Sequence, residues 1–195
     1  MLSQISVPSP HGGRAIALSD RQVTALRDKN KALEAKLAEL ITFGEENDAI
    51  GEKMHRLALA LLAPRDLPTL FSVLYYNLRE DFAIPHVALR VWRAGNAGLA
   101  EACAEFLPVS DEIRLYAAAL MQPYCGASGD VEAAGWLGDA APHVRSVAYI
   151  PLRDRECFGM LELGSEDNAR FQPEMGTLYL MRLGELAGAS IARFL

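Results

Sequence analysis

The sequence predicts an α+β protein in which helices flank an antiparallel sheet and a long helix precedes that domain. A seven-residue apolar repeat starts at Val23, and no proline interrupts residues 19–63. Two strand-like runs, 144–152 and 158–163, are separated by a short polar turn, so they must pair antiparallel. Apolar residues at helical spacing precede and follow these strands, which indicates helices packed on the sheet.

Composition limits the class of protein. The chain has 195 residues, 51% of them hydrophobic and 23% charged, which suits one globular domain with an appendage. The net charge of −6 disfavours nucleic acid as a partner, since an acidic surface repels phosphates. The longest apolar run, residues 57–63, is far shorter than the roughly 20 residues that cross a bilayer. No signal peptide is recognised, so we expect a cytoplasmic protein without a membrane partner.

The N-terminal region is expected to begin as a flexible tail and continue as a helix. Residues 1–18 are rich in proline, glycine and serine, which disfavour regular structure. Ser19 or Asp20 can cap a helix by accepting backbone N–H bonds, and no proline follows until Pro64. The sequence therefore predicts a dimerising helix over 19–63 and a domain over 64–195.

The first half of this helix carries the pattern of a parallel coiled coil. Seven-residue spacing keeps one apolar stripe facing a partner helix, and Asn30 occupies an a position, where paired Asn side chains fix the register. The predicted seam between two copies of the chain consists of Val23, Leu26, Asn30, Leu33, Leu37 and Leu40. The alternative is an amphipathic helix that packs on its own domain.

The repeat weakens further along the helix. Gly44 and Gly51 fall at a positions and Asn47 at a d position. Each glycine costs a helix interior about 1 kcal/mol relative to alanine. A bend or break is therefore expected near Gly44.

The domain is expected to open with a helix and a strand. Apolar residues recur at helical spacing over 67–82, and Pro85 ends that helix. Alternation over 87–92 predicts a strand, and the glycines of residues 95–98 predict a turn. A further strand is expected over 102–107.

The remainder is expected to hold a capped helix, a hairpin and a terminal helix. Ser110 can cap a helix that runs to Gln122, ahead of Pro123, and a loop is expected over 126–138. The hairpin turns at Asp154. After a loop over 164–170, Pro173 suits the first turn of a helix that runs to the C-terminus.

The segment SVAYIPLRDRECFGMLELGS resembles the paired strands of GAF domains. Two more segments are RQVTALRDKNKALEAKLAELI and LGSEDNARFQPEMGTLYLMRLGE. Together with the Cys125-Gly126 pair, these two resemble the bacterial domain of unknown function 484 family, which combines an N-terminal helix with a GAF-like domain. The resemblance covers roughly residues 20–195. It implies a GAF-like sensor fold and dimer-forming helices, and it implies no reaction.

The last of these segments also has a physical interpretation. Gly164 permits a sharp exit from its strand, and Ser165 and Asp167 can bond nearby backbone amides. Arg170 can pair with Asp167, and Phe171 can fill the core. All of these roles are structural.

No enzymatic or metal motif is recognised. The sequence holds no phosphate-binding glycine loop, no Cys-x-x-Cys and no His-Glu-x-x-His, so neither a cofactor nor a metal is expected. Cys125-Gly126 and His143-Val144 are similar to landmarks of free methionine sulfoxide reductases, in which a thiolate attacks the sulfoxide. The cysteine expected shortly after His-Val is absent, since Arg145, Ser146 and Val147 stand there.

The resemblance to GAF domains implies that a small molecule can lie between the sheet and its covering loops. The candidate lining residues are Cys125, Trp136, His143 and Tyr149. Alternatively, these side chains fill the core, as aromatic residues often do.

Together these observations favour a non-catalytic, homodimeric regulatory, sensor or scaffolding protein of bacterial signalling. Its ligand would be a small molecule or an unidentified protein partner. Two alternatives remain: a cysteine-dependent free methionine sulfoxide reductase, and a protein-interaction adaptor without a ligand.

Overall fold

The structure, a computed structural model, describes residues 12–93, 103–129, 131–173 and 176–195, and the side chains from residue 21 onward within them. The chain divides into two compact units, Met1–Ala49 and Ile50–Leu195. The division lies at Ile50, and not at the expected residue 64, because Met54, Leu57 and Leu61 are buried in the core of the second unit.

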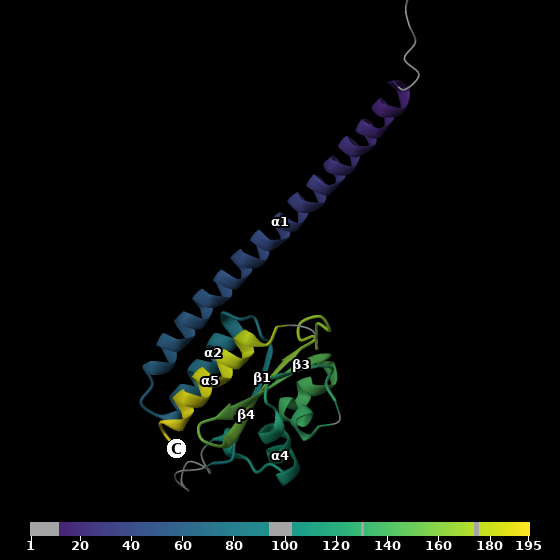
Figure 1. Cartoon of the computed structure of the whole chain (residues 1–195). Coiled ribbons are helices and arrows are strands. Elements are labelled where there is room, and N and C mark those ends of the chain that lie inside the picture. Colours follow the sequence, from purple (N-terminus) through teal and green to yellow (C-terminus); the bar gives the residue numbers. More distant parts are fainter. Residues whose placement is uncertain (1–11, 94–102, 130, 174–175) are drawn as a thin grey trace, which may run out of the picture. The chain divides into compact units, whose positions relative to one another are not determined.

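Helix α1, Gly12–Leu62, is one continuous helix (Figure 1). It begins seven residues ahead of Ser19, so residues 12–18 are helical and not a tail, while residues 1–11 lie outside the described part. The expected break near Gly44 is wrong, since the helix runs through both Gly44 and Gly51. A penalty of about 1 kcal/mol per glycine does not outweigh the hydrogen bonds of a long helix on either side.

Helix α2, Leu67–Glu80, follows as predicted, two residues shorter than expected at its end. The Oδ1 atom of Asp66 accepts the N–H of Thr69 at 2.8 Å and caps the helix, and Pro68 occupies its first turn. The buried face consists of Leu67, Leu70, Phe71, Leu74 and Leu78. Its apolar spacing therefore does place one stripe against the core.

Four strands form one antiparallel sheet in the order β1-β4-β3-β2. They are β1 His86–Val91, β2 Tyr124–Gly126, β3 Ser146–Arg153 and β4 Cys157–Ser165. The predicted hairpin is confirmed as β3–β4, with Tyr149 opposite Glu162. Strand β2 was not predicted, and its last residue, Gly126, was expected to begin a loop, because three residues are too short to show a period of two.

Both faces of the sheet are covered, so the predicted α+β fold is confirmed (Figure 1). Helices α2 and α5, the latter Leu178–Ala192, cover one face with the last turns of α1. Helix α4, Asp111–Ala119, and the 3₁₀ segment η2, Glu132–His143, cover the other. We call these the α5 face and the α4 face.

The segment after β1 differs from the prediction. Residue 102 lies outside the described part, and the residues after it form a 3₁₀ turn, η1 Ala104–Phe106, where a strand was expected. The Phe106 side chain is buried, and its ring lies 6.2 Å from that of Phe71. Packing of this ring against α2 therefore favours a turn over an extended backbone.

Three arginines hold the ends of neighbouring elements. The Arg153 guanidinium donates to the carbonyls of Ala117, Ala118 and Leu120 at the end of α4, which stops at Ala119 and not at Gln122. Arg193 of the C-terminal segment donates to the carbonyls of Leu61, Leu62 and Pro64 at the end of α1. These side chains satisfy carbonyls that a helix end leaves without partners.

The third arginine corrects a prediction about the loop after β4. Arg170 donates to the carbonyl of Phe82 at 2.7 Å, and its guanidinium does not pair with Asp167. Two other predicted roles are confirmed: Ser165 and Asp167 accept backbone amides through their side chains, and Phe171 is buried. The predicted exit from the strand at Gly164 is wrong, because Gly164 lies within β4 and pairs with His86 and Val147. The final helix begins at Leu178, later than Pro173 suggested.

Candidate functional site

The four residues predicted to line one pocket do not meet in one place. Tyr149 is fully buried on the α4 face, and Trp136 packs against the same cluster. Cys125 lies in the core of the α5 face. His143 is exposed at the end of η2, beside a polar cleft with Arg145 and Glu166. The joint pocket is therefore a correction: only Trp136 and Tyr149 share a face.

Strand alternation explains why Cys125 is separated from Tyr149. Cys125 is opposite Ala148 in the β2–β3 pairing, and both side chains belong to the core of the α5 face. The next residue of β3, Tyr149, must then point to the other face. Cys125 is 4% exposed, and burial raises the pKa of its thiol.

The α4 face contains a buried polar pair, Glu162 and Tyr149, which stand directly opposite each other on β4 and β3. Both residues are 0% exposed. Neither carboxylate oxygen of Glu162, nor the hydroxyl of Tyr149, has a hydrogen-bond partner among the described residues. Buried polar atoms almost always have partners in folded proteins, so this pair is an exception that requires an explanation.

Burial changes the ionisation of both side chains. It raises the pKa of Glu162 to about 8, although the guanidinium of Arg90 acts in the opposite direction. Burial, and next the charge of Glu162, raise the pKa of the Tyr149 hydroxyl well above its ordinary value. At neutral pH the carboxyl group of Glu162 is therefore mostly protonated, so it can both donate and accept a hydrogen bond.

Aromatic rings surround Tyr149 on two sides. The Tyr124 ring stacks on it with centroids 5.6 Å apart, and the Tyr116 ring meets it edge-on at 6.2 Å. Farther along the same face, the guanidinium of Arg90 lies 5.4 Å above the Trp136 ring and donates to the carbonyl of Leu89. The polar pair is thus enclosed by aromatic side chains and one cation that already has partners.

A cleft of about 340 Å³ lies on the same face, between the start of α4 and the start of η2. Its lining residues are Ser110, Glu112, Ile113, Tyr116, Val131 and Glu132. The Glu132 carboxylate accepts the backbone N–H of Ser110 at 3.2 Å, which ties the two segments together. Tyr116 lines the cleft and its ring contacts Tyr149, whereas neither Tyr149 nor Glu162 is among the described lining residues. A ligand in the cleft would therefore reach the buried pair only past the Tyr116 ring.

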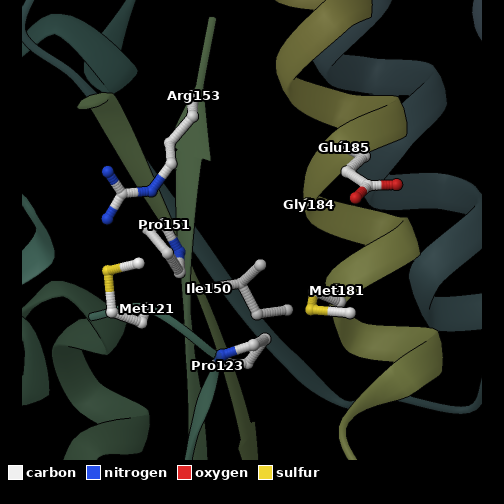
Figure 2. Close-up of a pocket in the computed structure, with 8 residues that line it drawn as sticks. All are labelled: Met121, Pro123, Ile150, Pro151, Arg153, Met181, Gly184 and Glu185. Atoms are coloured by element: carbon white, nitrogen blue, oxygen red, sulfur yellow. The ribbon is translucent and has the colours of Figure 1, made fainter. Parts of the chain in front are cut away.

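A second groove lies on the α5 face, with a volume of about 190 Å³. Figure 2 shows Met121 on one side and Met181, Gly184 and Glu185 of α5 on the other, with Ile150 and Pro151 of β3 and Pro123 between them. Arg153 also lines the groove, but its guanidinium already donates hydrogen bonds to the carbonyls at the end of α4. None of its described lining residues has a buried polar atom without a partner, and the two unpartnered side chains Glu162 and Tyr149 lie on the other face of the sheet.

The cysteines lack the features of reactive thiols. All three are free, and burial raises the pKa of each. Reactive cysteines instead have a lowered pKa, set by a nearby cation or a helix N-terminus. Among the described residues, no group of three or more His, Cys, Asp and Glu side chains has the arrangement of a metal site.

Sequence reasoning missed Glu162, Tyr116 and Arg90 as members of this site. One signal was visible, because Glu162 is the only charged residue in the strand Phe-Gly-Met-Leu-Glu-Leu-Gly. Burial of an unpaired carboxylate in a strand that is covered on both faces costs free energy of folding. Such a residue is therefore a candidate for a role in binding. The positions of Tyr116 and Arg90 depend on tertiary packing, which this signal does not reveal.

Comparison with solved structures gives the class of fold. The chain is similar to the free methionine-R-sulfoxide reductase of Neisseria meningitidis in complex with its substrate, with a TM-score of 0.53 and 18% identity, over 73% of this chain and 88% of that one. It is also similar to the GAF domain of a protein described as a sensor histidine kinase from Pseudomonas syringae pv. tomato, with a TM-score of 0.48 and 16% identity, over 77% and 90% of the two chains. The domain has a GAF-like fold, and these identities establish nothing beyond the fold.

The sequence match is more specific than the structural one. The family described as "Protein of unknown function, DUF484" matches residues 1–195, and the chain belongs to this family. The predicted resemblance is therefore confirmed. No curated protein matches the chain. Within the described residues, none of the helices combines the length and apolar character needed to cross a membrane.

Proposed function

We propose that this protein is a non-catalytic, cytoplasmic, homodimeric sensor that binds a small molecule on the α4 face of its GAF-like domain. The observation that carries the proposal is the buried pair Glu162 and Tyr149, whose polar atoms have no partner among the described residues. Each unsatisfied buried polar group costs about 1–3 kcal/mol. A ligand that supplies the missing hydrogen bonds recovers this free energy, and it therefore stabilises the domain when it binds.

The α1 residues before Ile50 support the homodimer. Every side chain from residue 21 to residue 49 is exposed, including Leu26 at 66%, Leu33 at 55% and Leu40 at 66%. Exposed leucines at heptad spacing favour a partner helix with the same spacing, and Asn30 favours a parallel pair in register. Farther along, the d positions Met54 and Leu61 are buried within the domain itself, so the seam available to a partner lies before them.

Sedimentation velocity on the full-length protein tests the dimer. Leu33→Asp places a charge at a d position and should convert the dimer to a monomer. Ala35→Asp is the matched control, because residue 35 falls at the outward f position of the same turn and should leave the dimer intact. A Leu33→Asp variant that sediments as a dimer would show that this seam is not the interface.

The melting temperature of the full-length protein tests the sensor. The low-molecular-mass fraction of extracts from the protein's own host should raise the melting temperature, since a ligand that binds only the folded state stabilises it by mass action. Separation of that fraction should confine the effect to few components. If no fraction changes the melting temperature, the protein-interaction adaptor becomes the better interpretation.

The reductase alternative has only the fold in its favour. Burial raises the pKa of all three thiols, and Cys125 lies on the opposite face from Glu162 and Tyr149. We therefore expect no turnover of free methionine sulfoxide in a thiol-coupled assay. Turnover by the wild type that disappears in Cys125→Ser would restore the enzyme hypothesis.

A further inference from the structure

The α4 face combines carboxylates and aromatic rings in a way that selects a class of ligand. Glu112 and Glu132 line the cleft, and its described lining residues include no lysine or arginine. Behind the cleft, Tyr116 contacts Tyr149, and Tyr149 stands opposite the buried Glu162. A route lined by carboxylates and aromatic faces attracts cations, both by charge and through the negative faces of the rings.

We propose that the ligand of this site is a small organic amine, which enters between α4 and η2 and places its ammonium group against Glu162 and Tyr149. The inference rests on the proposed sensor function and adds the chemical class. An ammonium group provides three donors and no acceptor. Its three donors match in number the three acceptor atoms left without partners, which are the two Glu162 oxygens and the Tyr149 hydroxyl oxygen.

An anionic ligand fits the site less well. The cation on this face near Glu162 is Arg90, and its guanidinium already lies over Trp136 and donates to the carbonyl of Leu89. An anion would also have to pass Glu112 and Glu132. The rings of Tyr116 and Tyr124 flank Tyr149 and present π faces or edges, without adding positive charge.

Binding of an amine should be coupled to loss of the Glu162 proton. The groups that face this carboxyl are Arg90 from β1 and Tyr149 from β3, with Tyr116 of α4 and Tyr124 of β2 behind Tyr149. Only the ionised carboxylate pairs with the ammonium, so affinity should rise with pH towards the Glu162 pKa of about 8. The expected rise is about tenfold between pH 6 and pH 7.

The test is a titration of the full-length protein with n-butylamine, 1-butanol and butyrate, which match in length and differ in charge. NMR shifts of the Tyr149 ring and the Glu162 side chain report binding at the site. We expect butylamine to bind more tightly than butanol or butyrate, and Glu162→Gln to weaken it at least about tenfold, the effect of losing a charge-assisted bond. Glu112→Gln, on the rim, should change the affinity by a smaller factor.

The outcomes distinguish failure of the amine proposal from failure of the sensor proposal. Tighter binding of butyrate, or equal affinity of the wild type and Glu162→Gln for butylamine, overturns the amine and leaves the sensor in place. If no probe binds but host fractions still raise the melting temperature, the amine proposal is also overturned and the sensor proposal stands. If probes and host fractions are both without effect, the sensor proposal fails together with the amine. Where Glu162→Gln folds poorly, Tyr149→Phe should still weaken butylamine binding, because it removes one acceptor.

Discussion

Glu162→Gln should stabilise the protein increasingly as pH rises. In the unfolded chain the Glu162 carboxyl releases its proton near its ordinary pKa of 4.5, whereas in the fold it keeps the proton until about pH 8. Between these values the unfolded state binds fewer protons, so the stability of the wild type falls as pH rises. Glutamine has no proton to lose, and the variant therefore escapes this loss.

The magnitude follows from the pKa difference. Each pH unit within that window changes the free energy of unfolding by about 1.4 kcal/mol, less near its ends. Between pH 5 and pH 8 the variant should gain about 3 kcal/mol relative to the wild type. In a chain of this length that corresponds to roughly 6–12 °C in melting temperature.

Urea denaturation at pH 5, 6, 7 and 8, followed by circular dichroism, measures this difference. Burial of the glutamine amide adds the same penalty at each pH. The change of the stability difference with pH therefore reports the ionisation of Glu162 alone. Glu112→Gln is the control, because its carboxylate is at the surface and is screened by solvent. A difference that stays flat from pH 5 to pH 8 would mean that Glu162 is ionised and paired in the fold, and the site as described would be wrong.

Three further substitutions test the packing around the sheet and within α1, each by denaturation against the wild type. Arg193→Met removes the donor to Leu61 and its neighbouring carbonyls and should destabilise the domain by about 1–3 kcal/mol; an unchanged midpoint refutes this capping role. Gly184→Ala would place a Cβ 2.6 Å from Ile150 Cγ2, and overpacking of this kind costs about 1–3 kcal/mol; a neutral effect would show that α5 shifts freely. Gly44→Ala meets no atom within 4 Å and should increase helix stability by about 1 kcal/mol; a loss of helicity would contradict the continuous α1.

The hairpin could be predicted because its evidence is local. Residues 144–152 and 158–163 show strand composition and share a short turn, and pairing follows from geometry alone. Strand β2 could not be predicted in the same way, since its three residues pair only because β3 provides an edge. The 3₁₀ turn η1, which stands where a strand was expected, likewise depends on Phe106 packing against Phe71, a contact between distant segments.

The candidate site was predictable only in part, for a similar reason. Tyr149 and Trp136 were identified because aromatic residues in a GAF-like domain tend to line the space beside the sheet. Cys125 was assigned to the wrong face, because its orientation depends on the register of a strand that was not foreseen. Glu162 stands out in the sequence as the lone charged residue of its strand, but only the structure shows that its oxygens have no partner among the described residues.

Native mass spectrometry on full-length protein purified from its own host tests whether Glu162 and Tyr149 bind a small molecule. We predict a dimer that carries a reproducible extra small mass, and the loss of that mass in Glu162→Gln purified in the same way. An empty wild-type dimer, or a bound mass that Glu162→Gln retains unchanged, would contradict the assignment of this buried pair as the binding site.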